Sequence, residues 1–292
     1  MNANATMQIV RSVAELQNIL NPRQREGRTV GFVPTMGFLH EGHLALVEQA
    51  RREHDLVVMS IFVNPAQFGP GEDYEAYPRD EQRDAELAAA AGVNYLFIPS
   101  VKEMYPHDSS IRILPGAQAE QLCGASRPGH FDGVLKVLLK LFNIVNPDES
   151  YFGMKDAQQL AIIETFVRDF NLRTAINRVE TVREEDGLAK SSRNVHLTDS
   201  ERQEASAIYR ALGSGKKSYY EGVPLKEVEK IVSSAIENNT SGTIDYIKAL
   251  AYPSLNENFS DADEIIIATA VKFSSTRLID NIIMSTIKDE KK

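Results

Sequence analysis

Residues 29–54 read TVGFVPTMGFLHEGHLALVEQARREH, and this segment decides the fold class. Its apolar start is rich in β-branched and aromatic residues and predicts a short strand that ends at Pro34. Its second half predicts a helix that begins near Glu41. The inward face of that helix carries Leu44, Val47 and Ala50. A strand therefore leads into a helix through a turn that holds two glycines and two histidines.

The same alternation of strand and helix continues to about residue 181. Strands are predicted at 29–33, 55–63, 93–99, 149–153 and 174–181. Helices are predicted between them at 41–54, 80–92, 133–145 and 156–170. Gly92 is the expected C-cap of the second helix, and the third is apolar nearly all round, which indicates burial. Alternating strands and helices predict an α/β fold, a doubly wound parallel sheet covered on both faces.

The composition changes near residue 182, where a polar stretch begins. Beyond it we expect a helix over 200–212, capped by Thr198 or Asp199, and a second helix near 224–237. Strands are predicted at 243–252 and 264–273. The chain is therefore divided into a domain at 1–181 and a smaller α+β domain at 182–292. GSGKKS (213–218) resembles a phosphate-binding loop only in part, and we interpret it as a flexible loop between helices.

Composition excludes several classes of protein. The formal net charge of the 292-residue chain is −9, which disfavours a nucleic-acid binder. No run of eighteen apolar residues predicts a membrane span, and the N-terminus lacks the apolar region of a signal peptide. Cys123 is the single cysteine, so no intramolecular disulfide forms. These features together favour a cytoplasmic protein.

Polar clusters follow the predicted strands, where ligands bind in such sheets. The first is PTMGFLHEGH (34–43), in which Gly37 and Gly42 allow close approach of the backbone to a ligand. The N-terminus of the next helix makes the turn an anion site. His40 and His43 lie one helical turn apart, and we favour a function over simple capping. Metal binding is disfavoured because HEGH lacks the HExxH spacing and a third ligand.

Two further clusters offer amides and a guanidinium. Asn64 and Gln67 follow the second strand, where they either recognise hydroxyl or carboxylate groups or form an ordinary turn. Arg127 presents a planar fork suited to a carboxylate or phosphate, and His130 lies close to it. For Asp132 we favour the N-cap of the buried helix.

The last two clusters are cationic. In YFGMKDAQQL (151–160) Lys155 offers a point charge for phosphates. Gln158 and Gln159 cannot both face one ligand, because helical neighbours point about 100° apart. In DGLAKSSRNVHL (186–197) two cations and two hydroxyls occupy residues 190–193. They suit a polyphosphate whose charge grows in a transition state, although a solvated loop is the alternative.

Taken together, the clusters resemble the pantothenate synthetase (pantoate–β-alanine ligase) family over most of the chain. The motifs that carry the resemblance, in order and spacing, are PTMGFLHEGH, FVNPAQF, YPRD, RPGHFDGV, YFGMKDAQQL, DGLAKSSRN and TRLIDN (276–281). HEGH is also similar to the HxGH signature of nucleotidyltransferases and class I aminoacyl-tRNA synthetases, and KSSR to their KMSKS loop.

The resemblance implies a Rossmann-like first domain and a second domain that acts as a lid over ATP. It implies an ATP-dependent, AMP-forming ligase of pantothenate and coenzyme A biosynthesis. (R)-pantoate is first activated as pantoyl adenylate with release of pyrophosphate, and β-alanine then displaces AMP. Mg²⁺ is implied as the partner of ATP, and the protein is expected to be a homodimer.

The resemblance also assigns residues. His43 is implied as the proton donor, and His40 as a triphosphate ligand. The remaining catalytic candidates are Lys155, Ser191, Ser192 and Arg193. The implied ATP-binding residues are Met36, Gly37, Phe38, Leu39, His40, Glu41, Gly42, His43, Gly153, Met154, Lys155, Asp156, Val182, Lys190, Ser191, Ser192 and Arg193.

The acid and the amine have their own candidates. Gln67 and Gln159 are implied to hold pantoate, and Gln67 also borders β-alanine. Arg127 and His130 are implied to flank the entry of the second substrate. Asp84 is a candidate for contacting Mg²⁺, but we favour an exposed helical carboxylate at this position.

Two other functions stay open at this point. The first is a nucleotidyltransferase that keeps the adenylyl group on its product, and the release of free AMP distinguishes the ligase from it. The second is a nucleotide-binding regulatory module, which would not need a second pocket with amides such as Gln67 and Gln159.

Overall fold

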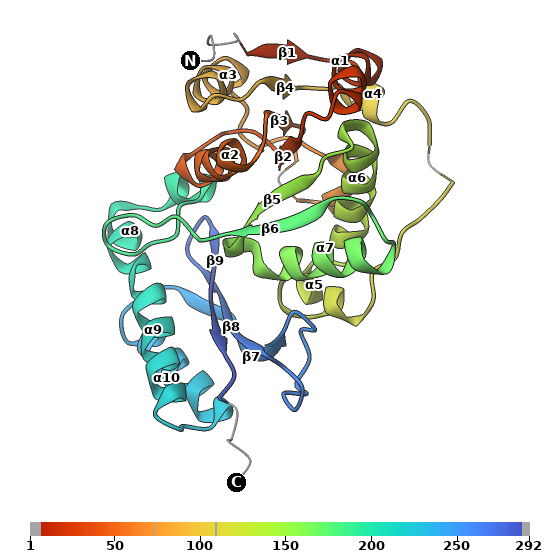
Figure 1. Ribbon diagram of the computed structural model, residues 1–292. Helices are drawn as coiled ribbons and strands as arrows, with labels where there is room; N and C mark the ends of the chain where they lie inside the picture. The colour runs from red at the N-terminus through yellow and green to blue at the C-terminus, as the bar shows by residue number, and fades with distance from the viewer. Residues whose placement is uncertain (1–6, 73, 109, 288–292) are drawn as a thin grey trace. The chain divides into compact units, whose positions relative to one another are not determined.

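The computed structural model describes residues 7–72, 74–108 and 110–287, which form two compact units (Figure 1). Unit 1 takes the chain up to Gly116 together with Arg127–Met154 and Ile163–Glu180. Unit 2 takes Ala117–Ser126, Lys155–Ile162 and the chain from Thr181 onward. No helix among the described residues is both long and apolar enough to cross a lipid bilayer.

Unit 1 is built on a parallel sheet, as predicted. Its strands follow the order β1-β4-β3-β2-β5-β6, and each neighbouring pair is parallel. The strands are β1 (Gln8–Val10), β2 (Val30–Thr35), β3 (Leu56–Ile61), β4 (Tyr95–Phe97), β5 (Glu149–Gly153) and β6 (Ala175–Val179). The β1 strand was not predicted, because three residues are too few to show a period.

Helices cover both faces of this sheet, which confirms the doubly wound class. They are α1 (Val13–Arg25), α2 (Glu41–Glu53), α3 (Glu81–Ala91), the short α4 (Val101–Met104) and α6 (His130–Val145). One core cluster packs α2 and α3 against the sheet through side chains such as Val47, Ala88 and Met59. On the other side, α6 contacts β2 and α1 packs against α6. Figure 1 shows these two helical layers.

The strand order reverses beside β2. From β2 the chain moves to β3 on one side, and β5 and β6 lie on the other. Ligands of doubly wound sheets bind at the carboxyl ends of strands at such a switch point. The β2 strand runs through Pro34 to Thr35, two residues beyond the predicted end. Pro34 is tolerated because the ladder to β5 covers only Gly31 and Phe32, so no bond from its nitrogen is needed there.

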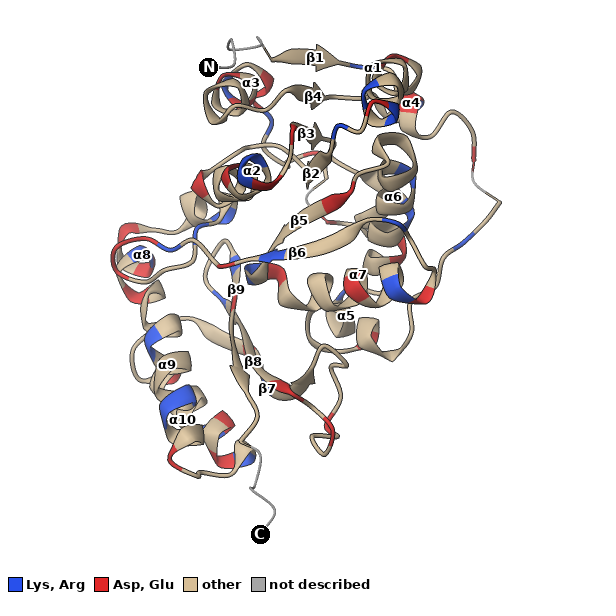
Figure 2. Ribbon diagram, in the orientation of Figure 1, with Lys and Arg blue, Asp and Glu red and all other residues tan. Residues whose placement is uncertain are grey.

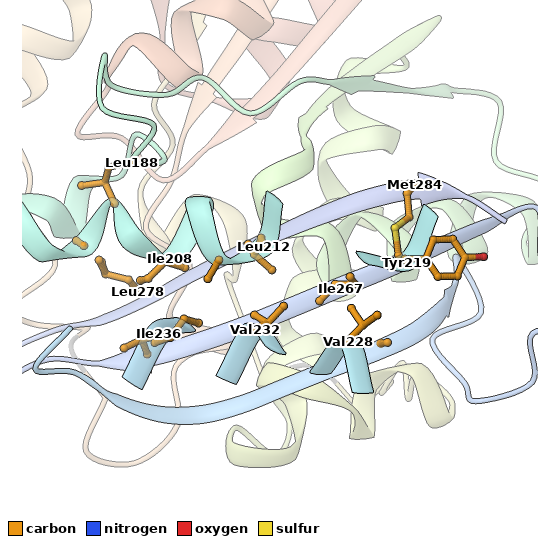
Figure 3. Close-up of a cluster of buried hydrophobic side chains, with 14 of the residues drawn as sticks. Leu188, Ile208, Leu212, Tyr219, Val228, Val232, Ile236, Ile267, Leu278 and Met284 are labelled. Atoms are coloured by element: carbon orange, nitrogen blue, oxygen red, sulfur yellow. The ribbon is translucent and has the colours of Figure 1, made fainter. Parts of the chain in front are cut away.

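Unit 2 contains an antiparallel sheet of order β7-β8-β9. Its strands are β7 (Thr243–Tyr252), β8 (Glu264–Lys272) and β9 (Arg277–Ser285). The helices α8 (Asp199–Ala205), α9 (Ala207–Tyr220) and α10 (Leu225–Glu237) belong to this unit. Figure 3 shows Leu212, Val232 and Ile267 within one buried cluster formed by α9, α10 and the sheet.

A second apolar cluster covers the opposite face of this sheet. It joins α5 (Leu122–Ser126) and the start of α7 (Ala157–Asp169) to β7 and β8. Leu122 and Ala161 contribute from the helices, and Leu250 and Ile266 from the strands. The predicted inward face of α7 is confirmed. Its residues Ala157, Leu160, Ile163 and Phe166 are all buried.

The segment 213–218 corrects one prediction, because it lies inside α9 and is not a loop. Gly215 is buried there, and a Cβ on it would lie 2.5 Å from Val232 Cγ2, so α9 and α10 approach closely at this point. Gly215, one of the two glycines that suggested a loop, is needed for the packing of α9 against α10. The predicted helix over 200–212 is divided at Ser206, and Thr198 caps the first part through a capping box with Glu201.

Candidate active site

The turn after β2 is held open by a buried carboxylate. Phe38 has a φ of 51° and Gly37 a φ of 87°, so the chain reverses sharply before α2. Asp84, on α3, accepts hydrogen bonds from the backbone N–H groups of Phe38 and Leu39, each at 2.7 Å. Leu39 is fully buried and anchors the turn in the core.

Asp84 is therefore not the exposed helical carboxylate that the sequence suggested. It is 1% exposed, and each of its oxygens accepts a backbone N–H. A Cβ on Gly37 would lie 3.0 Å from Asp84 Oδ2 and 2.8 Å from Ile61 Cγ2, so only glycine fits beneath the turn. Asp84 thus determines the path of the backbone between β2 and α2.

His40 and His43 both cap the first turn of α2, because each ring accepts a hydrogen bond from a backbone N–H of that turn. His40 is the N-cap, and its Nδ1 accepts from the N–H of Gly42 at 3.1 Å. Nδ1 of His43 accepts from the N–H of His40 at 3.3 Å. A Cβ on Gly42 would lie 2.8 Å from His40 Cε1, so the second glycine makes room for this ring. The two ring centroids lie 4.1 Å apart.

This capping determines where the ring protons lie. A nitrogen that accepts a hydrogen bond carries no hydrogen, so Nδ1 of both imidazoles is unprotonated in this arrangement. The hydrogen of each neutral ring is then on Nε2, which makes Nε2 the donor. The turn between β2 and α2 therefore combines two imidazole donors with the N-terminal N–H groups of a helix, and this combination suits an anion.

Gln67 lies beside this turn. Its Nε2 is 3.1 Å from the sulfur of Met36, and its Oε1 accepts from Asn64 Nδ2 at 3.1 Å. Asn64 is 1% exposed and also donates to the carbonyl of Gly133 and accepts from the hydroxyl of Tyr105. Asn64 is therefore a structural amide, whereas Gln67 is the amide that reaches the histidine turn.

Arg127 and His130 hold the backbone of Gln67, whereas Asn64 holds its side chain. Arg127 forms a bidentate pair with Glu72, with both N–O distances at 2.7 Å, and its Nη1 donates to His130 Nε2 at 3.1 Å. Because that nitrogen accepts, Nδ1 of His130 carries the hydrogen and donates to the carbonyl of Gln67 at 2.8 Å. The fork of Arg127 is thus occupied by a carboxylate of the chain itself.

Glu72 was not predicted to belong to this network. The hydrogen bond from Arg127 lowers the pKa of its carboxyl to about 2 against the cost of burial. The predicted N-cap at Asp132 is also wrong. The helix α6 begins at His130 with Gly129 as its cap at a φ of 81°, and Asp132 lies in the first turn. A cap with no side chain leaves little signal in the sequence.

The carboxyl end of β5 leads from unit 1 into unit 2. Gly153 ends the strand, and Met154, Lys155 and Asp156 form a short 3-10 turn before α7. Lys155 Nζ lies 4.0 Å from Asp156 Oδ2. Gly153 and Met154 belong to unit 1, whereas Lys155 and Asp156 belong to unit 2.

The two adjacent amides of α7 differ as expected. Gln158 is buried and donates to the carbonyls of Gln118 and Gln121 while accepting from the N–H of Gly124. It holds the segment around α5 in place. Gln159, one position on, is half-buried and points elsewhere on the helix. This leaves Gln159 as the amide of the pair suited to a ligand.

Residues 182–193 form a hairpin and a short turn in unit 2. Val182 and Lys190 are joined by a backbone hydrogen bond of 2.9 Å, and Lys190 Nζ lies 2.9 Å from Glu184 Oε2. Ser191 caps the following turn by accepting from the N–H of Arg193. Figure 2 shows acidic residues gathered on this loop and on α8, close to the cationic residues at 190–193.

The predicted site residues thus fall into two sets. In unit 1 the structure brings together the histidine turn 36–43, Asp84, Gln67, Arg127 and His130, and places Gly153 and Met154 at the end of a neighbouring strand. Unit 2 contains the others, which are Lys155, Asp156, Gln159, Val182, Lys190, Ser191, Ser192 and Arg193.

Comparison with known proteins gives a consistent result. A family model described as pantoate-beta-alanine ligase matches residues 8–283. A pantothenate synthetase of Bacillus pumilus is 53% identical over 279 residues, which cover 95% of this chain and 96% of the relative. One of Bacillus subtilis is 51% identical over 280 residues, with coverages of 95% and 97%.

Solved structures agree. Pantothenate synthetase from Thermus thermophilus superposes with a TM-score of 0.88 at 45% identity, covering 94% of this chain and 99% of the other. Pantoate-beta-alanine ligase from Francisella tularensis, described as complexed with beta-gamma ATP and beta-alanine, gives a TM-score of 0.77 at 37% identity. It covers 95% of this chain and 97% of its own.

Proposed function

The chain belongs to the pantoate–β-alanine ligase family, and from this premise we propose how its own residues carry out the reaction. The enzyme condenses (R)-pantoate with β-alanine to pantothenate and uses ATP. The carboxylate of pantoate attacks the α-phosphorus, and pyrophosphate leaves to give pantoyl adenylate. The amine of β-alanine then attacks the acyl carbon, and AMP leaves.

The observation that carries the proposal is the reciprocal capping of His40 and His43. It places the hydrogen of each neutral imidazole on Nε2, beside the N-terminus of α2 at the switch point of the sheet. Charge builds on phosphate oxygens as pyrophosphate leaves. Preorganised donors stabilise that charge without having to reorganise during the step. We therefore assign His43 as the donor to the phosphates and His40 as its companion.

Three cationic side chains and two hydroxyls complete the phosphate site in this proposal. Lys155 meets the phosphates from the turn after β5, and Lys190, Ser191, Ser192 and Arg193 meet them from the loop that follows β6; all five belong to unit 2. These residues belong to unit 2, whereas the histidine turn belongs to unit 1, and this division supports a lid role for residues 182–292. The segments Met36–His43 and Gly153–Asp156, with Val182, enclose ATP.

Gln67 and Gln159 select the acid. Gln67 is held in place by Asn64 through its side chain and by His130 through its carbonyl, so its amide presents a fixed geometry. A fixed amide recognises a hydroxyl or carboxylate group with little loss of entropy on binding. Gln67 also borders β-alanine in this proposal. Arg127 and His130 act through Gln67, because the fork of Arg127 is already paired with Glu72.

Magnesium enters as part of the substrate, since ATP is used as its magnesium complex. Asp84 does not fit as a ligand for it, because both of its oxygens accept backbone N–H groups. No step is therefore assigned to a metal held by this residue. We further propose a homodimer and a cytoplasmic location. The family resemblance supports the dimer, and the single cysteine agrees with a reducing compartment.

Isotope exchange between pyrophosphate and ATP tests the proposed chemistry. Pantoate without β-alanine supports the exchange if the acid is adenylylated first. Addition of β-alanine then yields free AMP, whereas a nucleotidyltransferase would keep the adenylyl group on its product. Absence of exchange with pantoate and other small hydroxy acids would refute the adenylate route.

A further inference from the structure

The motif TRLIDN (276–281) has no part in the site described so far. Its last two residues lie in the middle of β9, where Asp280 pairs with Thr269 and Asn281 with Ala268 of β8. Consecutive residues of a strand point to opposite faces of a sheet. Leu278 and Met284 share the face of Asp280, and both belong to the cluster under α9 and α10. Asp280 therefore faces the side of the sheet covered by α9 and α10, and Asn281 faces the side covered by α5 and the start of α7.

Asp280 holds the hairpin that leads into the KSSR segment. It is 5% exposed, and its two oxygens lie 2.7 and 3.0 Å from the guanidinium nitrogens of Arg183. Arg183 also donates to the carbonyl of Gly187 at 3.1 Å and stacks at 3.5 Å over the ring of Tyr209. A bidentate pair with stacking fixes the orientation of the guanidinium, which a single point contact would not do.

The contacts of Arg183 tie down the base of the hairpin. Arg183 bridges Ala189 as an antiparallel pair, and the backbone N–H of Lys190 donates to the carbonyl of Val182. Leu188 is buried in the apolar cluster, where Figure 3 shows it together with Leu278. Lys190 is thus one residue beyond a hairpin base that is fixed to β9.

Asn281 holds the other phosphate segment. It is 8% exposed, and its Nδ2 donates to the backbone carbonyl of Lys155 at 2.9 Å. Its face of the sheet carries the cluster that includes Ala157 and Ala161 of α7. The contact is to the backbone, so it fixes where the side chain of Lys155 begins while leaving its ammonium available to a ligand.

We propose that Asp280 and Asn281 are positioning residues for the nucleotide site, one for the KSSR segment and the other for Lys155. The inference rests on the proposed function, because it needs Lys155 and residues 190–193 to bind the phosphates. Two adjacent residues of one strand then set the spacing between two cationic segments that lie far apart in the sequence. Misplacement of a group by about 1 Å costs up to roughly a hundredfold in rate.

The test compares Asp280→Asn and Asn281→Ala with two controls on the same strand. Met284→Ala removes a buried side chain from the face of Asp280, and Ile283→Ala removes a partly buried one from the face of Asn281. We expect both test variants to lower kcat/KM for ATP by roughly 10- to 100-fold while the KM for pantoate stays unchanged. The controls lower the melting temperature and leave the kinetics for ATP unchanged.

Two further measurements keep the test decisive if Asp280→Asn folds poorly. The double variant Arg183→Gln with Asp280→Asn removes both charges, and we expect it to recover part of the kcat/KM for ATP because no buried charge is left unpaired. Trypsin cleavage after Lys190 and Arg193 is expected to be faster in Asp280→Asn than in Met284→Ala at equal melting temperature.

The outcomes separate this inference from the proposed function. If Lys155→Ala and Arg193→Ala impair the use of ATP but Asp280→Asn and Asn281→Ala behave like the controls, the positioning role is wrong and the phosphate site stands. If Lys155→Ala and Arg193→Ala leave the kinetics for ATP unchanged, both are overturned. Selective loss of ATP kinetics in the test variants supports the positioning role.

Discussion

Asp84 Oδ1 lies 2.7 Å from the backbone nitrogen of Leu39, forty-five positions earlier in the chain. This contact, with its partner at Phe38, joins α3 to the turn that carries His40. A carboxylate that accepts two backbone N–H groups fixes the conformation of the backbone that donates them. Loss of this carboxylate is therefore expected to displace His40 and His43, although none of the hydrogen bonds described joins Asp84 to either histidine.

Asp84→Asn tests this link. The amide replaces one acceptor with an N–H that faces another N–H, so we expect a loss of about 1–3 kcal/mol in stability. We also expect a fall in kcat as the histidine turn shifts. Asp80→Ala is the matched control, because Asp80 caps α3 through the N–H of Arg83 and its loss costs about 1 kcal/mol. Equal kinetics in the two variants at equal stability would contradict the role of Asp84.

His43→Ala removes the proposed donor to the phosphates. We expect kcat to fall by about 10²- to 10⁴-fold, the range for a positioned proton-transfer group. Some loss of stability follows as well, because Nδ1 of His43 also caps the N–H of His40. His107→Ala, at an exposed position, serves as the control for the removal of an imidazole. Steady-state kinetics with unchanged kcat in His43→Ala would show that the assignment is wrong.

The adjacent amides of α7 offer a matched pair. Gln159→Ala is expected to raise the KM for pantoate with little change in melting temperature. Gln158→Ala is expected to cost about 1–3 kcal/mol of stability, because the carbonyls of Gln118 and Gln121 lose their donor. Thermal unfolding and pantoate titrations on both variants measure the two effects. A reversed pattern would mean that Gln158 faces the substrate.

The Glu72–Arg127 pair predicts a dependence of stability on pH. The pKa of Glu72 falls from an ordinary value of 4.5 to about 2 in the folded chain. A lowered folded pKa stabilises the protein above pH 4.5, and that stability is lost as the pH falls from 4.5 towards 2. Glu72→Gln is expected to lower stability at neutral pH and to flatten the decline in this window. Melting curves from about pH 2 to neutral pH measure it, with the exposed Glu75→Gln as control.

Two glycines of α9 have opposite expected responses to alanine. Gly213 is exposed with nothing near its Cβ position, so Gly213→Ala is expected to stabilise the helix by about 0.5–1 kcal/mol. Gly215 faces Val232 at 2.5 Å, so Gly215→Ala is expected to cost about 1–3 kcal/mol. Chemical denaturation of both variants measures the difference. Equal effects would show that α9 and α10 can separate without cost.

Local patterns in the sequence predicted much of this fold. The β2 strand, its turn and α2 were predicted from composition and period, and Gly92 is the left-handed C-cap expected for α3. What was missed depends on contacts between distant residues. Asp84 was misread because its partners are backbone N–H groups, which leave no trace in residue types. The β9 strand was noticed only as a motif, and 213–218 was misread because glycine also serves helix packing.

The residue types of the site were predicted from the sequence, but the contacts between distant residues were not. The family motifs identified the histidines, the amides and the cations, but the hydrogen bonds that hold them were not apparent from the sequence. Glu72 is an acidic residue in a loop until Arg127 and His130 are brought to it. The assignment of roles to these residues, and the division at 181 and 182, stay predictions that the variants above address.

The alternation of β9 constrains how the chain can tolerate changes in length. Asp280 and Asn281 serve opposite faces only because they occupy consecutive positions of a strand paired with β8. A single residue inserted within β9 before Asp280 would exchange the two faces. The carboxylate would then be directed to the carbonyl of Lys155, and the amide would move to the place of Ile282 on the other face, so neither segment would keep its partner. Insertions and deletions in this strand are therefore expected to be far less acceptable than substitutions of its apolar residues.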